Sequence, residues 1–183
     1  MATNNKILYF GYGANSRKKM MEVITGNRNL VGYPAILKGF ILCIQRLDQI
    51  PDSVLSSSPA PISPRQLLKE SWPDSFESYI IKSASKTDEV AGTIWELTFQ
   101  ERELVRDWEL IDFGWYRDIK TKALTEDGRE VEVETEGLRD GQEVDRVVDG
   151  KNYEPFINPL KDFQRVAEKA RREYLERIQT KSP

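Results

Sequence analysis

The order of strand-like and helix-like segments is the feature that most limits the fold of this chain. Short apolar or alternating runs are typical of strands, and residues at helical spacing separate and follow them. The two kinds of segment are mixed without the steady alternation of a doubly wound parallel sheet, so we expect an α+β fold. The expected strands cover residues 6–10, 36–46, 78–84, 89–97, 116–124 and 129–135, with helices near 17–24, 66–70, 99–109 and 163–178.

The length of 183 residues suits one domain over positions 1–183, with a sizeable core. Residues 48–75 are rich in Ser and Pro, which disfavour both helix and sheet. We expect a long surface loop or insertion there, with a lid over a ligand as the alternative. Cys43 lies in an apolar run and is expected to be a packed thiol.

Composition excludes several classes of function. A formal charge of −3 argues against nucleic acid as a main partner, because phosphate binding depends on an excess of Lys and Arg. No apolar run approaches the roughly 20 residues of a membrane span, and the first residues lack the basic and apolar regions of a signal peptide. A single cysteine fits the reducing cytoplasm, where we expect the protein to be located.

The chain has no histidine. Catalysis by Ser-His-Asp or Cys-His sets and metal binding by an HExxH motif are therefore excluded. One cysteine without histidine also argues against a closed zinc site. If the protein is an enzyme, its proton transfers depend mainly on Glu, Asp, Lys or Tyr. A substrate that carries its own nucleophile would suit such a chain.

The stretch YFGYGANS, residues 9–16, joins the first expected strand to a helix. Glycine at positions 11 and 13 permits backbone conformations in which several N–H groups converge on one point. The helix start behind the loop adds free N–H donors and a partial positive charge, which suit a carboxylate or phosphate. A tight turn without a ligand is the alternative interpretation.

A second stretch, VRDWELIDFGWY at residues 105–116, combines acidic and aromatic side chains. Glu109 closes the expected helix beside Trp108, and partial burial there would raise its pKa towards that of a useful acid–base group. Most glutamates at helix ends face water, which is the alternative for Glu109. Another set of glutamates alternates along one expected strand, and we expect it to line the solvent-facing side rather than to bind a metal: Glu130, Glu132, Glu134 and Glu136.

Together these stretches resemble the γ-glutamylcyclotransferase-like proteins, including the γ-glutamylamine cyclotransferases. YFGYGANS is similar to the Tyr-Gly-Ser-Asn loop of that family, which follows the first strand and opens the first helix. EVAGTIWEL and LVRDWELIDFGWY resemble its second landmark, a Val-x-Gly strand, a helix ending in the catalytic Glu, and a Gly-x-Tyr strand. Glu109, Gly114 and Tyr116 match these motif residues, and NYEPF at 152–156 is loosely similar to the family's ending.

The resemblance implies a fold, a reaction and a general acid/base. It implies a small mixed β-barrel with surrounding helices, which cyclises a γ-glutamyl compound to 5-oxoproline and releases an amino acid or amine. Glu109 would transfer the protons. The amine-releasing branch is one alternative, and a non-catalytic small-molecule binder of the same fold is another.

The resemblance also implies which residues hold the substrate. The loop residues Tyr12, Gly13, Ala14 and Asn15 would bind a small γ-glutamyl molecule, and neither a metal nor a cofactor is needed. Ala14 stands where the family usually has Ser, which would matter if the hydroxyl contacts the substrate. Tyr116 is expected either to line the pocket or to be a barrel-strand aromatic.

Overall fold

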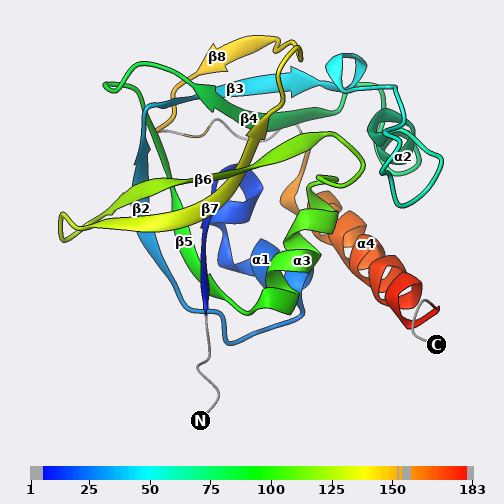
Figure 1. Cartoon of the computed structure of the whole chain (residues 1–183), viewed down its shortest axis with the longest axis horizontal. Helices are drawn as coiled ribbons and strands as arrows, with labels where there is room; N and C mark the ends of the chain where they lie inside the picture. Colours follow the sequence, from blue (N-terminus) through cyan, green and yellow to red (C-terminus); the bar gives the residue numbers. More distant parts are fainter. Residues whose placement is uncertain (1–5, 152, 154–157, 181–183) are drawn as a thin grey trace.

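A closed barrel forms the centre of the computed structural model, which describes residues 6–151, 153 and 158–180 (Figure 1). Neighbouring strands pair antiparallel except β1 and β7, whose parallel pairing closes the barrel. The expected α+β fold with a small mixed barrel is confirmed. In spatial order the barrel strands are β1 (Ile7–Gly11), β5 (Glu89–Leu97), β2 (Gly32–Lys38), β6 (Tyr116–Thr125) and β7 (Glu130–Leu138).

The apolar run at residues 36–46 is not one strand, as the sequence suggested, but parts of two. Its beginning belongs to β2, whereas its end is β3 (Phe40–Arg46) of a separate three-stranded sheet. The prediction was wrong because side chains on both sides of the corner are buried, so the apolar pattern continues across it. In this second sheet β3 lies between β4 (Glu77–Ser83) and β8 (Arg146–Val148).

Alternation along β1 directs neighbouring aromatic residues into two different cores. Phe10 belongs to an apolar cluster that joins the barrel strands to the second sheet, and Tyr9 belongs to a cluster between the barrel and the helices. Both side chains are fully buried. The resemblance at residues 152–156 lies outside the described part of the chain, apart from Tyr153.

Three helices lie against one another below the barrel in Figure 1: α1 (Lys18–Thr25), α3 (Phe99–Trp108) and α4 (Leu160–Thr180). Thr98 caps α3, since its side chain accepts the Glu101 N–H while the Glu101 carboxylate accepts the Thr98 N–H. This capping box confirms the expected start of α3. Among the described helices, none has both the length and the apolar character needed to cross a bilayer.

The Ser/Pro-rich stretch is more ordered than its composition suggests. It contains helix α2 (Pro64–Lys69), which begins where Ser63 caps it, two residues before the expected 66–70. Ser63 is fully buried, and its Oγ donates to Asp52 Oδ1 at 2.8 Å. Nε of Arg65 donates to the Ile50 carbonyl oxygen at 2.8 Å. These bonds hold α2 beside the start of the stretch, where Figure 1 places it near α4.

Candidate active site

The loop after β1 fixes the side chain of Asn15. It forms a short 3-10 helix (Gly13–Ser16), so α1 begins only at Lys18. Gly13 has φ +56°, a conformation that glycine adopts readily. At Gly11 a Cβ atom would lie 2.4 Å from the Asn15 carbonyl oxygen, which also accepts a 2.8 Å hydrogen bond from the Trp95 indole. The glycine therefore permits a close approach that holds Asn15 against β5.

Glu109 reaches the same loop from the end of α3. Its backbone N–H still bonds to the Val105 carbonyl, while Leu110 takes a left-handed conformation with φ +49° and turns the chain away. Few residues other than glycine adopt this conformation. The Glu109 carboxylate accepts a 2.6 Å hydrogen bond from Asn15 Nδ2. The two stretches that carried the family resemblance therefore meet at one bond.

A second carboxyl group is joined to Glu109 through Asn15 and Tyr9. The second N–H of Asn15 Nδ2 is donated to the Tyr9 hydroxyl at 2.9 Å. The Tyr9 hydroxyl donates in turn to Glu136 Oε1 at 2.7 Å. The Tyr12 hydroxyl donates to the Glu136 backbone carbonyl at 3.1 Å. Three successive hydrogen bonds thus connect two carboxyl groups that lie 27 positions apart in the chain.

The expectation that four alternating glutamates face solvent fails at Glu136. Glu130 and Glu132 are exposed as expected, but Glu134 is only partly so and Glu136 is 1% exposed. The alternation is correct, since all four project from one face of β7, yet α3 and the first loop cover that face towards its end. A local sequence pattern carries no signal of this covering.

Burial raises the pKa of both carboxyl groups. The pKa of Glu109 lies well above its ordinary value because the group is desolvated and because Glu136 is close, whereas the Asn15 hydrogen bond and the charge of Arg102 lower it. Burial raises the pKa of Glu136 to about 7, against the opposing charge of Arg102. Glu109 borders a cavity and is only half-buried by surface area, but protein surrounds it closely enough to desolvate its charge.

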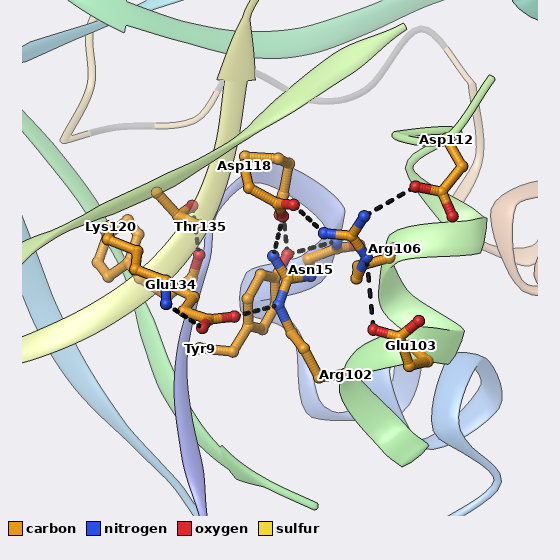
Figure 2. A network of polar contacts seen from close by, with 12 residues as sticks. Tyr9, Asn15, Arg102, Glu103, Arg106, Asp112, Asp118, Lys120, Glu134 and Thr135 are labelled. Carbon is orange, nitrogen blue, oxygen red and sulfur yellow. Dashed lines mark hydrogen bonds and ion pairs between the residues drawn. The ribbon is translucent and has the colours of Figure 1, made fainter. Parts of the chain in front are cut away.

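Arg102 of α3 supplies the nearest buried positive charge, and Figure 2 shows it between Asp118 and Glu134. Its side chain donates to Asp118 Oδ1 at 2.9 Å and to Glu134 Oε2 at 3.1 Å. The guanidinium carbon lies 4.9 Å from the centre of the Tyr9 ring, within cation–π range. Because Arg102 is 1% exposed, its field at Glu109 and Glu136 is weakly screened.

The linked groups border a cavity of about 120 Å³. Apolar walls come from Trp72 of the Ser/Pro-rich stretch, from Phe76 directly after it, and from Phe163 and Val166 of α4. The polar residues that line the cavity near the linked carboxyl groups are Tyr12, Asn15, Ser78, Glu109 and Glu136, and the loop residues Gly13 and Ala14 also line it.

Tyr116 does not line this cavity, although it matches the family motif. It is 1% exposed, and its ring stacks on Trp115 with centroids 4.2 Å apart. Its hydroxyl donates to the Tyr79 carbonyl at 3.2 Å and lies 3.1 Å from Ser78 Oγ. Its neighbour Trp115 reaches the cavity instead. Tyr116 thus lies behind residues that line the cavity rather than at its surface.

Comparison with known proteins finds similarity in structure only. No family model and no curated protein matches the sequence. A solved gamma-glutamyl cyclotransferase matches with a TM-score of 0.57 at 18% identity, over 98% of this chain and 89% of the other. An uncharacterized protein from Homo sapiens matches with a TM-score of 0.55 at 18% identity, over 97% and 89%. The chain therefore has the fold found in gamma-glutamyl cyclotransferase.

Proposed function

We propose that the protein is a cyclotransferase that converts a γ-glutamyl compound to 5-oxoproline. The observation that carries the proposal is the bond between Asn15 of the loop and the desolvated Glu109 carboxylate at the edge of a cavity. The fold shared with a gamma-glutamyl cyclotransferase supports it. The function itself rests on the site, because one fold serves many activities.

In the proposed reaction the α-amine of the substrate attacks its own γ-carbonyl carbon. Glu109 takes one proton from the α-ammonium group and releases it to solvent, and the free amine then forms the new C–N bond. The bonded nitrogen still carries one hydrogen more than the product, and Glu109 takes this second proton as the bond to the leaving nitrogen breaks. Glu109 then gives its proton to that nitrogen, which leaves as a free amine or as the amine of an amino acid. The nucleophile belongs to the substrate, which accords with a chain that has no histidine.

Two effects would supply most of the acceleration. The attack is intramolecular in the free substrate as well, so the cavity contributes by holding the glutamyl chain in a ring-forming geometry, which removes the entropy cost of reaching that geometry. Proton transfer by a positioned carboxyl group contributes roughly 100- to 10,000-fold. The raised pKa of Glu109 serves the second effect, because a carboxylate with raised basicity accepts a proton from an ammonium group more readily.

The apolar walls from Trp72, Phe76 and Phe163 would receive the part of the substrate beyond the γ-carbonyl. Ala14 lines the cavity as well, so its methyl group would replace a hydroxyl at the substrate surface. Release of an amino acid and release of a simple amine are both consistent with these walls.

The proposal is tested by mass spectrometry for 5-oxoproline. The wild-type protein is incubated with a panel of γ-glutamyl amino acids and γ-glutamylamines, with Glu109→Gln as the matched control. Formation of 5-oxoproline by the wild type but not by the variant is expected, and the compound consumed identifies the branch. Equal turnover by both proteins would contradict the role of Glu109, and no turnover of any panel member would favour a non-catalytic binder.

A further inference from the structure

We propose that Glu136 binds the α-ammonium group of the ligand through its Oε2 atom, so that the site selects compounds with a free primary α-amine. This inference rests on the proposed function, in which that amine is the nucleophile. It gives Glu136 a binding role and leaves proton transfer to Glu109.

The first argument is an unused buried acceptor. Glu136 is 1% exposed and lines the cavity, and its Oε1 atom accepts the Tyr9 hydroxyl at 2.7 Å. Within the described residues, its Oε2 atom is buried and has no hydrogen-bond partner. A buried carboxylate oxygen without a donor is costly, and native proteins rarely leave one unsatisfied. A ligand that supplies an N–H group would satisfy it.

The second argument is charge. Two desolvated carboxyl groups, those of Glu109 and Glu136, share this part of the cavity, and Arg102 already binds two other carboxylates. Among the described residues two cationic side chains line the cavity, and each lies near an acidic partner: Lys169 near Glu173 at 3.7 Å, and Arg177 near Asp107. At this point of the cavity a ligand group with one positive charge is favoured over a neutral or anionic group, because opposite charges attract strongly in a desolvated site.

The third argument is placement. Glu136 and Glu109 are connected through only Tyr9 and Asn15, so a ligand group bonded to Glu136 Oε2 stays near the Glu109 carboxylate. An α-ammonium group has three N–H donors. One can bond to Glu136 while another proton passes to Glu109, and the freed electron pair then forms the C–N bond. Glu136 ends the reaction in the state in which it began.

The test compares two ligands that differ only in the α-amine: a γ-glutamyl amide and the corresponding glutaryl amide. Binding is measured by calorimetry in the Glu109→Gln background, which does not consume the ligand. We expect Glu136→Gln to weaken the γ-glutamyl ligand about 30-fold or more, as for a buried charge pair that loses one partner, and the glutaryl ligand less than about threefold.

Glu134→Gln is the matched control. Glu134 lies on the same strand and the same face, two positions earlier, but it binds Arg102 and does not line the cavity. It should leave the ratio of the two affinities unchanged. If Glu136→Gln does not fold, Glu136→Asp provides the second test, because the shorter side chain should weaken only the γ-glutamyl ligand.

Equal weakening of both ligands by Glu136→Gln, or weakening of neither, would overturn the inference even if wild-type protein forms 5-oxoproline. Failure of both ligands to bind would overturn it as well. Selective loss of the γ-glutamyl ligand by a protein that forms no 5-oxoproline would instead retain the inference and refute the proposed reaction.

Discussion

Replacement of Asn15 by Ala should show how much the hydrogen bonds of its side chain contribute to stability and to the pKa of Glu109. The substitution removes the 2.6 Å bond to Glu109 and the 2.9 Å bond to Tyr9, and leaves the backbone contact with Trp95 in place. A hydrogen bond to a charged group contributes about 1.5–3 kcal/mol and one between neutral groups about 0.5–1.5 kcal/mol. The expected loss in the free energy of unfolding is therefore about 2–4 kcal/mol at a pH at which Glu109 is ionised.

The same substitution should change the pH dependence of the reaction. The Asn15 bond favours the ionised form of Glu109 and lowers its pKa, so removing the bond raises that pKa further. Because the ionised carboxylate is the base, the acid limb of kcat/KM should move to higher pH. On the pH-independent plateau, the lost orientation of the carboxylate should reduce kcat/KM about 10- to 100-fold, since each 1.4 kcal/mol corresponds to a tenfold change.

The assay is a pH series of 5-oxoproline formation, combined with urea denaturation of both proteins. Ser16→Ala is the control, since Ser16 lies in the same 3-10 helix and its Oγ donates at 2.7 Å to the Gly13 carbonyl, away from both carboxyl groups. It should lose about 1 kcal/mol of stability without moving the acid limb. An acid limb that stays in place or moves to lower pH in Asn15→Ala would refute the reasoning.

Three further predictions concern the groups around this bond. The pKa of Glu136 is about 7 in the folded protein against an ordinary 4.5, so the folded protein binds this proton more tightly than the unfolded chain does. The stabilisation from this proton is fully present below pH 4.5 and is lost as pH rises through 7. As pH rises through this range, Glu136→Gln should therefore become more stable relative to wild type, by roughly 3 kcal/mol at the upper end. Thermal melts of both proteins over a pH series measure this difference, and a difference that does not change with pH would contradict the prediction. Arg102→Gln should cost about 3–5 kcal/mol in urea denaturation, because it removes a buried guanidinium that makes charge-assisted hydrogen bonds to Asp118 and Glu134. Arg106→Gln in the same network (Figure 2), where the side chain is more exposed, should cost about 1 kcal/mol or less, and equal losses would show that the burial of Arg102 adds nothing to its contribution. Gly11→Ala should lose about 1–3 kcal/mol and most of the activity, since its Cβ would lie 2.4 Å from the Asn15 carbonyl oxygen, and a fully active variant would show that the loop adjusts freely.

The parts of the fold that depend on local chemistry were predictable from the sequence. Thr98 and Glu101 have the spacing of a capping box, and the structure forms both of its hydrogen bonds. A strand was predicted at 89–97, and β5 has the same bounds. These features need only neighbouring residues, so a pattern in one segment carries the information.

Features that depend on distant segments were predicted poorly. The sequence does not mark the corner at Gly39. Strands β2 and β3 belong to different sheets, but both contribute buried apolar residues, so the apolar pattern continues from one to the other. Glu136 lies on the face of β7 that its alternation predicts, but only the placement of α3 and the first loop buries it. For Tyr116 the sequence left two interpretations open, and the structure has the second of them: a barrel-strand aromatic whose hydroxyl bonds to the Tyr79 carbonyl behind the cavity.

The candidate site could be assembled in part. Tyr12 to Asn15 and Glu109 were selected from two separate stretches, and the structure brings them to one cavity, joined by the Asn15 bond. The link through Tyr9 to Glu136 was not foreseen, because hydrogen bonds across 127 sequence positions leave no local pattern.

The central claim is an intramolecular attack assisted by Glu109, and isotope labelling tests it most directly. The wild-type protein is incubated in water enriched in ¹⁸O with the γ-glutamyl compound that it consumes. The masses of the products are then measured by mass spectrometry. The account predicts unlabelled 5-oxoproline and released amine in equal amounts, with neither formed by Glu109→Gln. Glutamate carrying one ¹⁸O atom would show that water, not the α-amine, attacks the carbonyl, and would contradict the account.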